Sequence, residues 1–237
     1  QIDGRFRTSI ITYPTNGRQP PLTENGKKRM GVELEDFRLN TGTAFWLDEG
    51  GIGPYDNMEQ RPLRERCLLG FGPAAGPPIH PSAYNNLKRI VQTDDYVMIL
   101  AEMVHDARII PIYESPEEAR ANRRPLVLEQ WFGDSVGWYE NGELVVETIN
   151  IHPQQMSQSS LPITKQGRII ERFSRHADNE IFYQFIVEDS NIYHQPLTAE
   201  LSFYASDGLL YEYACHEGNY SMANILAGAR EEERRNQ

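Results

Sequence analysis

The chain has 237 residues and a mass of 27.2 kDa, a length that favours one large domain over two small ones. Hydrophobic residues make up 39% of it, and no apolar run approaches the roughly 18 residues that a membrane helix needs, so no membrane span is predicted. The formal net charge of −11 repels phosphate backbones, and nucleic acid is therefore not expected as a partner.

Residues 1–86 are predicted to form a long irregular N-terminal arm that packs on a body formed by residues 87–237, the two making one structural unit. The arm is rich in Pro, Gly, Asn and Arg and has no sustained hydrophobic periodicity. Within it, residues 70–78 cannot form a helix or a central strand, because proline lacks an amide donor and glycine loses too much entropy. This stretch is predicted to be a loop.

From residue 87 onward, short β-rich runs alternate with turn residues, a pattern typical of an antiparallel meander. The strongest signal is Asn141-Gly142, a pair that supplies the positive φ angles of a type I′ hairpin. About nine strands are enough to close into a barrel around one small ligand or to form a two-sheet sandwich. We expect a mainly β, barrel-like (lipocalin-like) domain. Its predicted strands are 88–92, 96–102, 108–113, 136–139, 144–151, 168–174, 181–188, 198–204 and 209–214.

Two helices are expected. The first covers residues 116–122 and follows Ser115, with Glu118 placed to complete a capping box. The second covers residues 221–235 and has an apolar stripe at helical spacing. This C-terminal helix is expected to cover one end of the barrel. The stripe consists of Met222, Ile225, Leu226 and Ala229.

Cys67 and Cys215 are the only cysteines in the sequence. They form either a disulfide in an oxidising compartment or two inert core thiols, and the disulfide is favoured. The sequence contains no spaced His or Cys ligand motif, no glycine-rich phosphate loop and no dinucleotide fingerprint. Neither a metal nor another cofactor is therefore expected.

Several stretches carry a resemblance to a known family. They are residues 61–67 (RPLRERC), 97–110 (VMILAEMVHDARII), 131–135 (WFGDS), 147–148, 171–173, 213–220 (YACHEGNY) and 225–230 (ILAGAR). Through them the chain resembles, over most of its length, a family of uncharacterised secreted or periplasmic bacterial proteins. The resemblance implies a leader peptide upstream of Gln1 and a periplasmic or secreted location, which supports an oxidising compartment. It implies no established reaction.

The first candidate site lies in the predicted hairpin that carries Glu102, His105, Asp106 and Arg108. A histidine beside carboxylates suits general acid–base catalysis, because the carboxylate orients the ring and tunes its pKa. The structural alternative is that Asp106 bonds its own backbone in a turn while Glu102 pairs with Arg108 across the hairpin.

The second candidate site is His216 and Glu217, which directly follow Cys215. If the last strand closes the barrel near the first hairpin, His105 and Glu217 become the proton-transfer groups, with Asp106 and His216 orienting them. The alternative is a loop anchored by Cys215, with Glu217 near the start of the last helix, where acids are favoured.

Ligand contacts are expected from Glu102, Arg108, Trp131, Tyr183 and Tyr213, although aromatic residues more often belong to a core. Residues 133–137 (GDSVG) match the spacing of a serine nucleophile elbow. Because a hairpin is predicted after them instead of a helix, the pattern argues against a nucleophilic Ser135.

The sequence thus favours a cofactor-independent acid–base enzyme, a lyase, isomerase or hydrolase, that acts on a small organic molecule in a barrel pocket. One alternative is a non-catalytic barrel that binds a small ligand. Another is an accessory subunit of an exported assembly, in which the N-terminal arm contacts a protein partner. The enzyme hypothesis requires His105 and either His216 or Glu217 to open onto one pocket.

Overall fold

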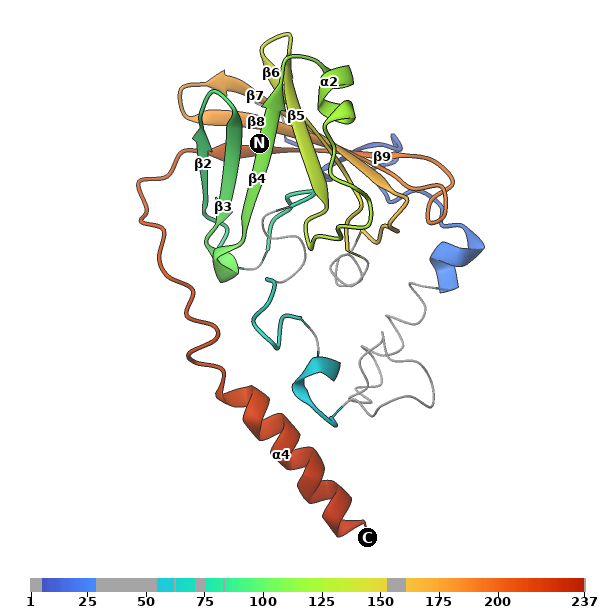
Figure 1. The fold of residues 1–237 in the computed structure, drawn as a ribbon. Coiled ribbons are helices and arrows are strands. Elements are labelled where there is room, and N and C mark those ends of the chain that lie inside the picture. Colours follow the sequence, from blue (N-terminus) through green and yellow to red (C-terminus); the bar gives the residue numbers. More distant parts are fainter. Residues whose placement is uncertain are drawn as a thin grey trace.

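The computed structural model describes residues 6–28, 55–61, 63–70, 76–82, 84–152 and 161–236. These residues form a mainly β structure built on a nine-stranded sheet with the order β1-β9-β8-β7-β6-β5-β4-β3-β2 (Figure 1). The strands are β1 (Ile11–Tyr13), β2 (Lys88–Gln92), β3 (Tyr96–Ala101), β4 (Ala107–Tyr113), β5 (Asp134–Glu140), β6 (Glu143–Ile149), β7 (Arg168–Ala177), β8 (Glu180–Glu188) and β9 (Leu197–Tyr204). The helices include α2 (Pro116–Ala121) and α4 (Tyr220–Arg235), residues 24–28 are also helical, and there are short 3-10 turns η1 (Met58–Gln60) and η2 (Met103–His105). The prediction of a mainly β domain with a C-terminal helix is confirmed.

The sheet is mixed, because β4 and β5 run parallel while the other neighbouring strands run antiparallel. The predicted antiparallel meander is therefore interrupted at this one position. Residues 114–133 connect the two strands and contain α2, a connection long enough for the crossover that parallel pairing needs. The parallel pairing is short and covers Ile112 opposite Gly137 and Tyr113 opposite Trp138.

The two edge strands, β1 and β2, share no ladder within the described part of the chain, so the sheet is open there. It is nevertheless strongly curved. One continuous buried cluster joins Val97, Ile99 and Ile110 of β3 and β4 to Tyr183 and Phe185 of β8, five strands along in the sheet order from β3. The concave face of this curved sheet holds the main core.

Local sequence explains the hairpin between β5 and β6. Asn141 and Gly142 have φ angles of 52° and 83°, as the predicted tight turn requires. In the strands that follow the turn, side chains alternate between the two faces of the sheet. Val146 and Thr148 consequently lie on the same face of β6, and Glu147 lies on the other.

Helix α2 covers the convex face of the sheet. Ser115 caps it by accepting a hydrogen bond from the amide of Glu118, and the Glu118 carboxylate accepts one from the amide of Glu114. Ala119 is fully buried and packs in a small cluster of its own. Its partners are Val136, Trp138 and Val145, with Tyr113 and Ile170 half-buried beside them.

The described parts of the N-terminal arm contact the body at separated points. Strand β1 adds to the sheet beside β9, and Leu22 forms an isolated bridge with Tyr193. The predicted disulfide between Cys67 and Cys215 is confirmed, and it joins the arm to the chain just before α4.

Helix α4 stands apart from the sheet in Figure 1, so the prediction that it covers a barrel end was wrong. It contacts the arm instead: Arg230 donates to the carbonyl of Asp56, and the capping residue Asn219 donates to the carbonyl of Glu65. Residues 209–214, predicted as a strand, also lie outside the sheet. Within the described ranges, no helix has both the length and the apolar character needed to cross a membrane.

Candidate functional site

A pocket of about 640 Å³ opens between the first residues of β4 and β5. The C-terminal residues of β4 pair with the middle of β5, and the two strands diverge toward their N-terminal ends (Figure 1), which leaves room for the pocket. We call it the Asp106 pocket. Its aromatic wall is Trp131 and Phe132, and its polar lining comprises Asp106, Arg108, Arg124, Glu129, Gln130, Asp134, Ser135 and His152.

Arg108 is held rigidly at the back of this pocket. Its guanidinium donates to Glu171 twice, with Nη1 3.0 Å from Oε1 and Nη2 2.6 Å from Oε2. The same Nη2 lies 3.4 Å from Ser135 Oγ and so bridges the gap between the diverging strands. Gly76 permits this arrangement, since a Cβ there would lie 2.3 Å from Arg108 Nη1 and its φ of +89° favours glycine. The two-point geometry fixes the orientation of the charged group.

Glu171 and Tyr183 lie behind Arg108 and are fully buried. The Tyr183 hydroxyl donates to Glu171 Oε1 at 2.7 Å and accepts from the amide of Ile79 at 2.8 Å. Burial, together with the negative charge of Glu171, raises the pKa of Tyr183 well above its usual range, so the phenol stays protonated. The carboxylate of Glu171 therefore has partners on both oxygens.

Ser135 continues this polar chain along the wall of the pocket. Its hydroxyl shares a hydrogen bond of 2.8 Å with the hydroxyl of Thr148 on β6. Hydrogen bonds thus link the amide of Ile79 to Thr148 through Tyr183, Glu171, Arg108 and Ser135. A buried network of this kind holds its members in one arrangement.

Asp106 provides the titratable group of the pocket. It lies at the end of η2, is 8% exposed, and accepts a hydrogen bond of 3.3 Å from the amide of Gly70. Burial raises the pKa of Asp106 to about 7, although the Gly70 amide and the charge of Lys88 act in the opposite direction. A carboxyl group with this pKa can both give and take a proton near neutral pH.

Trp131 and His152 form the opposite wall. Their ring centroids are 4.3 Å apart, and His152 Nε2 is 3.9 Å from Glu129 Oε2. Burial lowers the pKa of His152, an effect that the charge of Glu129 partly offsets. The imidazole is therefore largely neutral at pH 7.

Of the residues that the sequence singled out, Asp106, Arg108 and Trp131 line this one pocket, and Tyr183 reaches it through Glu171. The alternative that Glu102 pairs with Arg108 is wrong, because Arg108 pairs with Glu171. Glu102 instead accepts a hydrogen bond of 3.2 Å from the amide of Tyr211.

His105 binds the C-terminal segment. Its Nε2 accepts a hydrogen bond of 2.9 Å from the amide of Tyr213, whose hydroxyl lies 3.4 Å from that of Tyr84. These contacts of His105 and Glu102 explain why residues 209–214 leave the sheet, since two of their amides bond to side chains. His216 and Glu217 are exposed in the turn that contains Cys215. None of His105, His216 and Glu217 is among the described residues that line the Asp106 pocket, so these residues do not meet at this pocket the requirement that the sequence set for an enzyme.

Glu171, Asp134 and His152 were missed as site residues. Glu171 carried a readable signal, because it lies between Ile169 and Phe173 in an alternating strand and both neighbours are buried. An acid at an inward-facing position needs a buried cation or donor, and Arg108 is that cation. Asp134 and His152 gave no such signal, since their approach depends on how β4 and β5 diverge.

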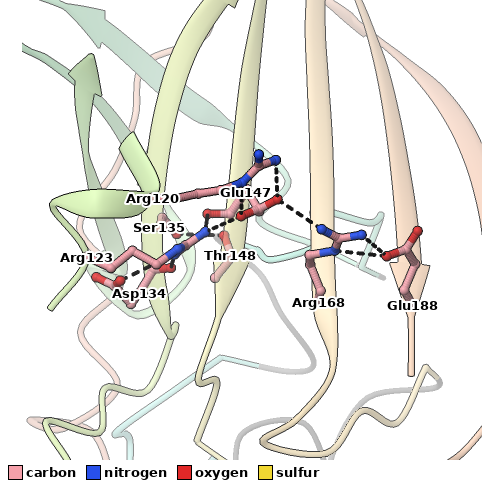
Figure 2. Close-up of polar contacts among 8 residues, drawn as sticks. All are labelled: Arg120, Arg123, Asp134, Ser135, Glu147, Thr148, Arg168 and Glu188. Atoms are coloured by element: carbon pink, nitrogen blue, oxygen red, sulfur yellow. Dashed lines mark hydrogen bonds and ion pairs between the residues drawn. The ribbon is translucent and has the colours of Figure 1, made fainter. Parts of the chain in front are cut away.

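A second polar cluster occupies the convex face (Figure 2). The carboxylate of Glu147, 4% exposed, receives hydrogen bonds from Arg120, Arg123 and Arg168 at 2.7–3.3 Å. Arg123 also pairs with Asp134 and Arg168 with Glu188, so three cations face three carboxylates. The charges balance, and the cluster ties α2 and the residues after it to the sheet.

Comparisons with known proteins gave no match: neither family models, nor curated proteins, nor solved structures resemble the chain significantly. Across the part of the chain that the structure describes, no three His, Cys, Asp or Glu side chains gather closely enough to hold a metal ion. The function is therefore inferred from the geometry of the site.

Proposed function

We propose that the chain is a cofactor-independent acid–base enzyme, a lyase, isomerase or hydrolase, that binds a small organic molecule in the Asp106 pocket and uses Asp106 to transfer a proton. The observation that carries the proposal is the convergence of Asp106, Arg108 and Ser135 on one pocket. Its volume of about 640 Å³ lies in the range usual for small-molecule sites.

The side chains of the pocket have different roles in the proposed reaction. Asp106 titrates near neutrality because of its burial and exchanges the proton. Ser135 offers its hydroxyl to an oxygen of the bound molecule beside the charge of Arg108, and Glu171 keeps the guanidinium in place. Trp131 offers an apolar face. These contacts suit a small molecule with a carboxylate or carbonyl oxygen near its reacting carbon.

The histidine and acid of the second candidate site take a supporting role in this proposal. His105 fixes the C-terminal segment through the amide of Tyr213, and Cys215 ties the same segment to the arm. His216 and Glu217 follow in that anchored turn. The contacts of Glu102 and His105 and the disulfide keep the segment beside η2.

We also propose that the curved sheet acts as a barrel-like, lipocalin-like container in an exported, periplasmic or secreted protein. A single core that joins β3 and β4 to β8 supports the curvature that such a container needs. The disulfide supports an oxidising compartment, in line with the family resemblance.

A non-catalytic ligand-binding protein is the second candidate. One observation favours it: Glu171 already compensates the charge of Arg108. A compensated guanidinium is suited to orienting a ligand, which is all that a binding site requires. The two candidates differ in what they demand of Asp106, because a binding protein needs the carboxyl group only as a contact.

The test is an activity screen read by proton NMR in D₂O. A panel of hydroxy acids, keto acids and small esters is incubated with wild type, with Asp106→Asn and with Asp94→Asn, an exposed control in the β2–β3 turn. We expect at least one compound to be converted or deuterated by wild type and by the control, with a rate roughly 100-fold or more lower in Asp106→Asn. Equal rates in Asp106→Asn would contradict the proton-transfer role. Binding that Asp106→Asn weakens, without turnover by wild type, would favour the binding protein.

A further inference from the structure

A second pocket, of about 520 Å³, lies at the open edge of the curved sheet, between β2 and the ends of β7, β8 and β9. We call it the Lys88 pocket. Its apolar wall consists of Ile79, Ile90, Ile99, Ile181 and Phe203. It shares no lining residue with the Asp106 pocket, so it is a separate site.

Lys88 faces the same side of the sheet as this apolar wall. In the β2–β3 register Lys88 lies opposite Ala101, and Ile90 lies opposite Ile99. Lys88 and Ile90 are two positions apart on β2, and residues two apart on a strand share a face. Its Nζ donates to the carbonyl of Asn86 at 3.3 Å. Lys88 forms no ion pair with the carboxylates that the structure describes.

Burial is the dominant influence on this ammonium group and lowers the pKa of Lys88, although the charges of Glu102 and Asp106 favour its protonated form. A half-buried ammonium beside apolar side chains loses hydration that one carbonyl does not replace. A partner anion would restore the lost interaction.

Charged side chains of both signs lie on the rim of the pocket. Arg89 follows Lys88 on β2 and so faces the other side of the strand, whereas Arg175 lies beside Asp178 and donates to its backbone carbonyl. The rim also contains Glu180, whose carboxylate accepts a hydrogen bond from Tyr204. Ser202 also lines the pocket, and its Oγ is buried.

We propose that the Lys88 pocket binds a small amphipathic anion, with its apolar body against the isoleucines and Phe203 and its carboxylate or sulfonate paired with Lys88. An ion pair shielded from water is stronger than an exposed one. A hydrocarbon or aromatic body packed against the apolar wall removes both apolar surfaces from water, which favours binding. The site does not depend on the reaction proposed for the Asp106 pocket.

Two fluorescent probes that differ in one charge test this proposal. 8-Anilinonaphthalene-1-sulfonate is an anion, and N-phenyl-1-naphthylamine has the same ring system without the sulfonate. We expect wild type to bind the anion more tightly, and decanoate to displace both probes. Lys88→Met should weaken binding of the anion about tenfold or more and leave the uncharged probe unchanged. Lys27→Met, at an exposed lysine paired with Glu24, is the matched control and should bind both probes as wild type does.

A second variant locates the probes. Leu210 is half-buried on the wall of the pocket, outside the sheet, so Leu210→Trp should reduce the available volume and weaken both probes at least about tenfold. Unchanged binding of the uncharged probe by Lys88→Met shows that the pocket remains folded in that variant. The proposal is overturned if Lys88→Met binds the anion as tightly as wild type, or if Leu210→Trp leaves both affinities unchanged.

Discussion

Arg108 and Glu171 form a two-point ion pair that spans the concave face of the sheet, with Nη2 2.6 Å from Oε2 and side chains no more than 2% exposed. Arg108 lies on β4 and Glu171 on β7, with β5 and β6 between them in the sheet order. Side chains on strands that are separated by two others can touch directly only if the sheet is curved. The pair therefore links the curvature of the fold to the back wall of the Asp106 pocket.

Removal of the cation should destabilise the fold strongly. In Arg108→Met, Glu171 keeps a buried carboxylate without its counter-charge, and the free energy of unfolding should fall by about 3–5 kcal/mol. The double variant Arg108→Met with Glu171→Leu should lose less than Arg108→Met alone, because no charge is left buried. Urea unfolding followed by circular dichroism measures both. A loss below about 1 kcal/mol in Arg108→Met would contradict the role of the pair.

Loss of the Tyr183 hydroxyl should also be measurable. Tyr183→Phe removes one donor to Glu171 and one acceptor for the amide of Ile79, and should lower the free energy of unfolding by about 1–3 kcal/mol. Tyr204→Phe removes an exposed hydroxyl that bonds Glu180 and should stay within about 0.5 kcal/mol of wild type. Equal effects of the two variants would argue against a special contribution of the buried network.

Asp106 should make stability fall as pH rises. Its pKa in the folded protein is about 7, above the ordinary 3.8, so the folded state binds the proton more tightly than the unfolded state. This contribution is complete below about pH 4 and is lost as pH rises to about 7, a total on the order of 4 kcal/mol. Asp106→Asn should remove this slope and be more stable than wild type at pH 8. Parallel pH profiles of the two proteins, from urea unfolding, would contradict the assignment.

Glu147 should have the opposite pH dependence. Burial alone would raise the pKa of Glu147, but hydrogen bonds from Arg120 and Arg123 and their charges outweigh it and lower the pKa. The stabilisation is present above the ordinary value of 4.5 and is lost as pH falls through the lowered value. Thermal unfolding of Glu147→Gln should be less sensitive to acidification below pH 4.5 than that of wild type. Glu188→Gln, which removes only one partner of Arg168, is the milder control.

Reduction of the disulfide should lower the thermal stability. Cys67 and Cys215 are 148 residues apart, and closure of so long a loop contributes about 5 kcal/mol by the chain-entropy estimate. A scan with and without reductant measures the change in Tm, and Cys67→Ser with Cys215→Ser should be unaffected by reductant. An unchanged Tm of reduced wild type would show that the bridge leaves the cooperative unit unaffected.

Local signals in the sequence predicted local structure well. The turn at Asn141-Gly142 and the cap at Ser115 depend on adjacent residues, and both form as expected. The pairing of β4 with β5 could not be predicted in the same way, because it depends on where the chain goes after α2. The same holds for residues 209–214, whose amides are taken by Glu102 and His105.

The candidate site was predicted where the chemistry of a residue or of its chain neighbours indicated it, and Trp131 was expected as an aromatic contact. Asp106 and Arg108 were identified together because they are neighbours in the chain. Glu171 is 63 residues from Arg108, and only the curvature of the sheet brings them together. His105 was expected in the pocket for its chemistry, but its imidazole bonds the amide of Tyr213.

The central claim is that the Asp106 pocket takes a small molecule, and a fluorine NMR fragment screen tests it most directly. Ala107 is exposed on the wall of the pocket, so Ala107→Trp should fill the pocket without disturbing the core. Ala223→Trp, at an exposed position of α4, is the matched control. We predict that fluorinated carboxylate or carbonyl fragments bind wild type and the control and are lost in Ala107→Trp. Fragments that bind Ala107→Trp as well as they bind wild type, or a screen without any carboxylate or carbonyl hit, would contradict the claim.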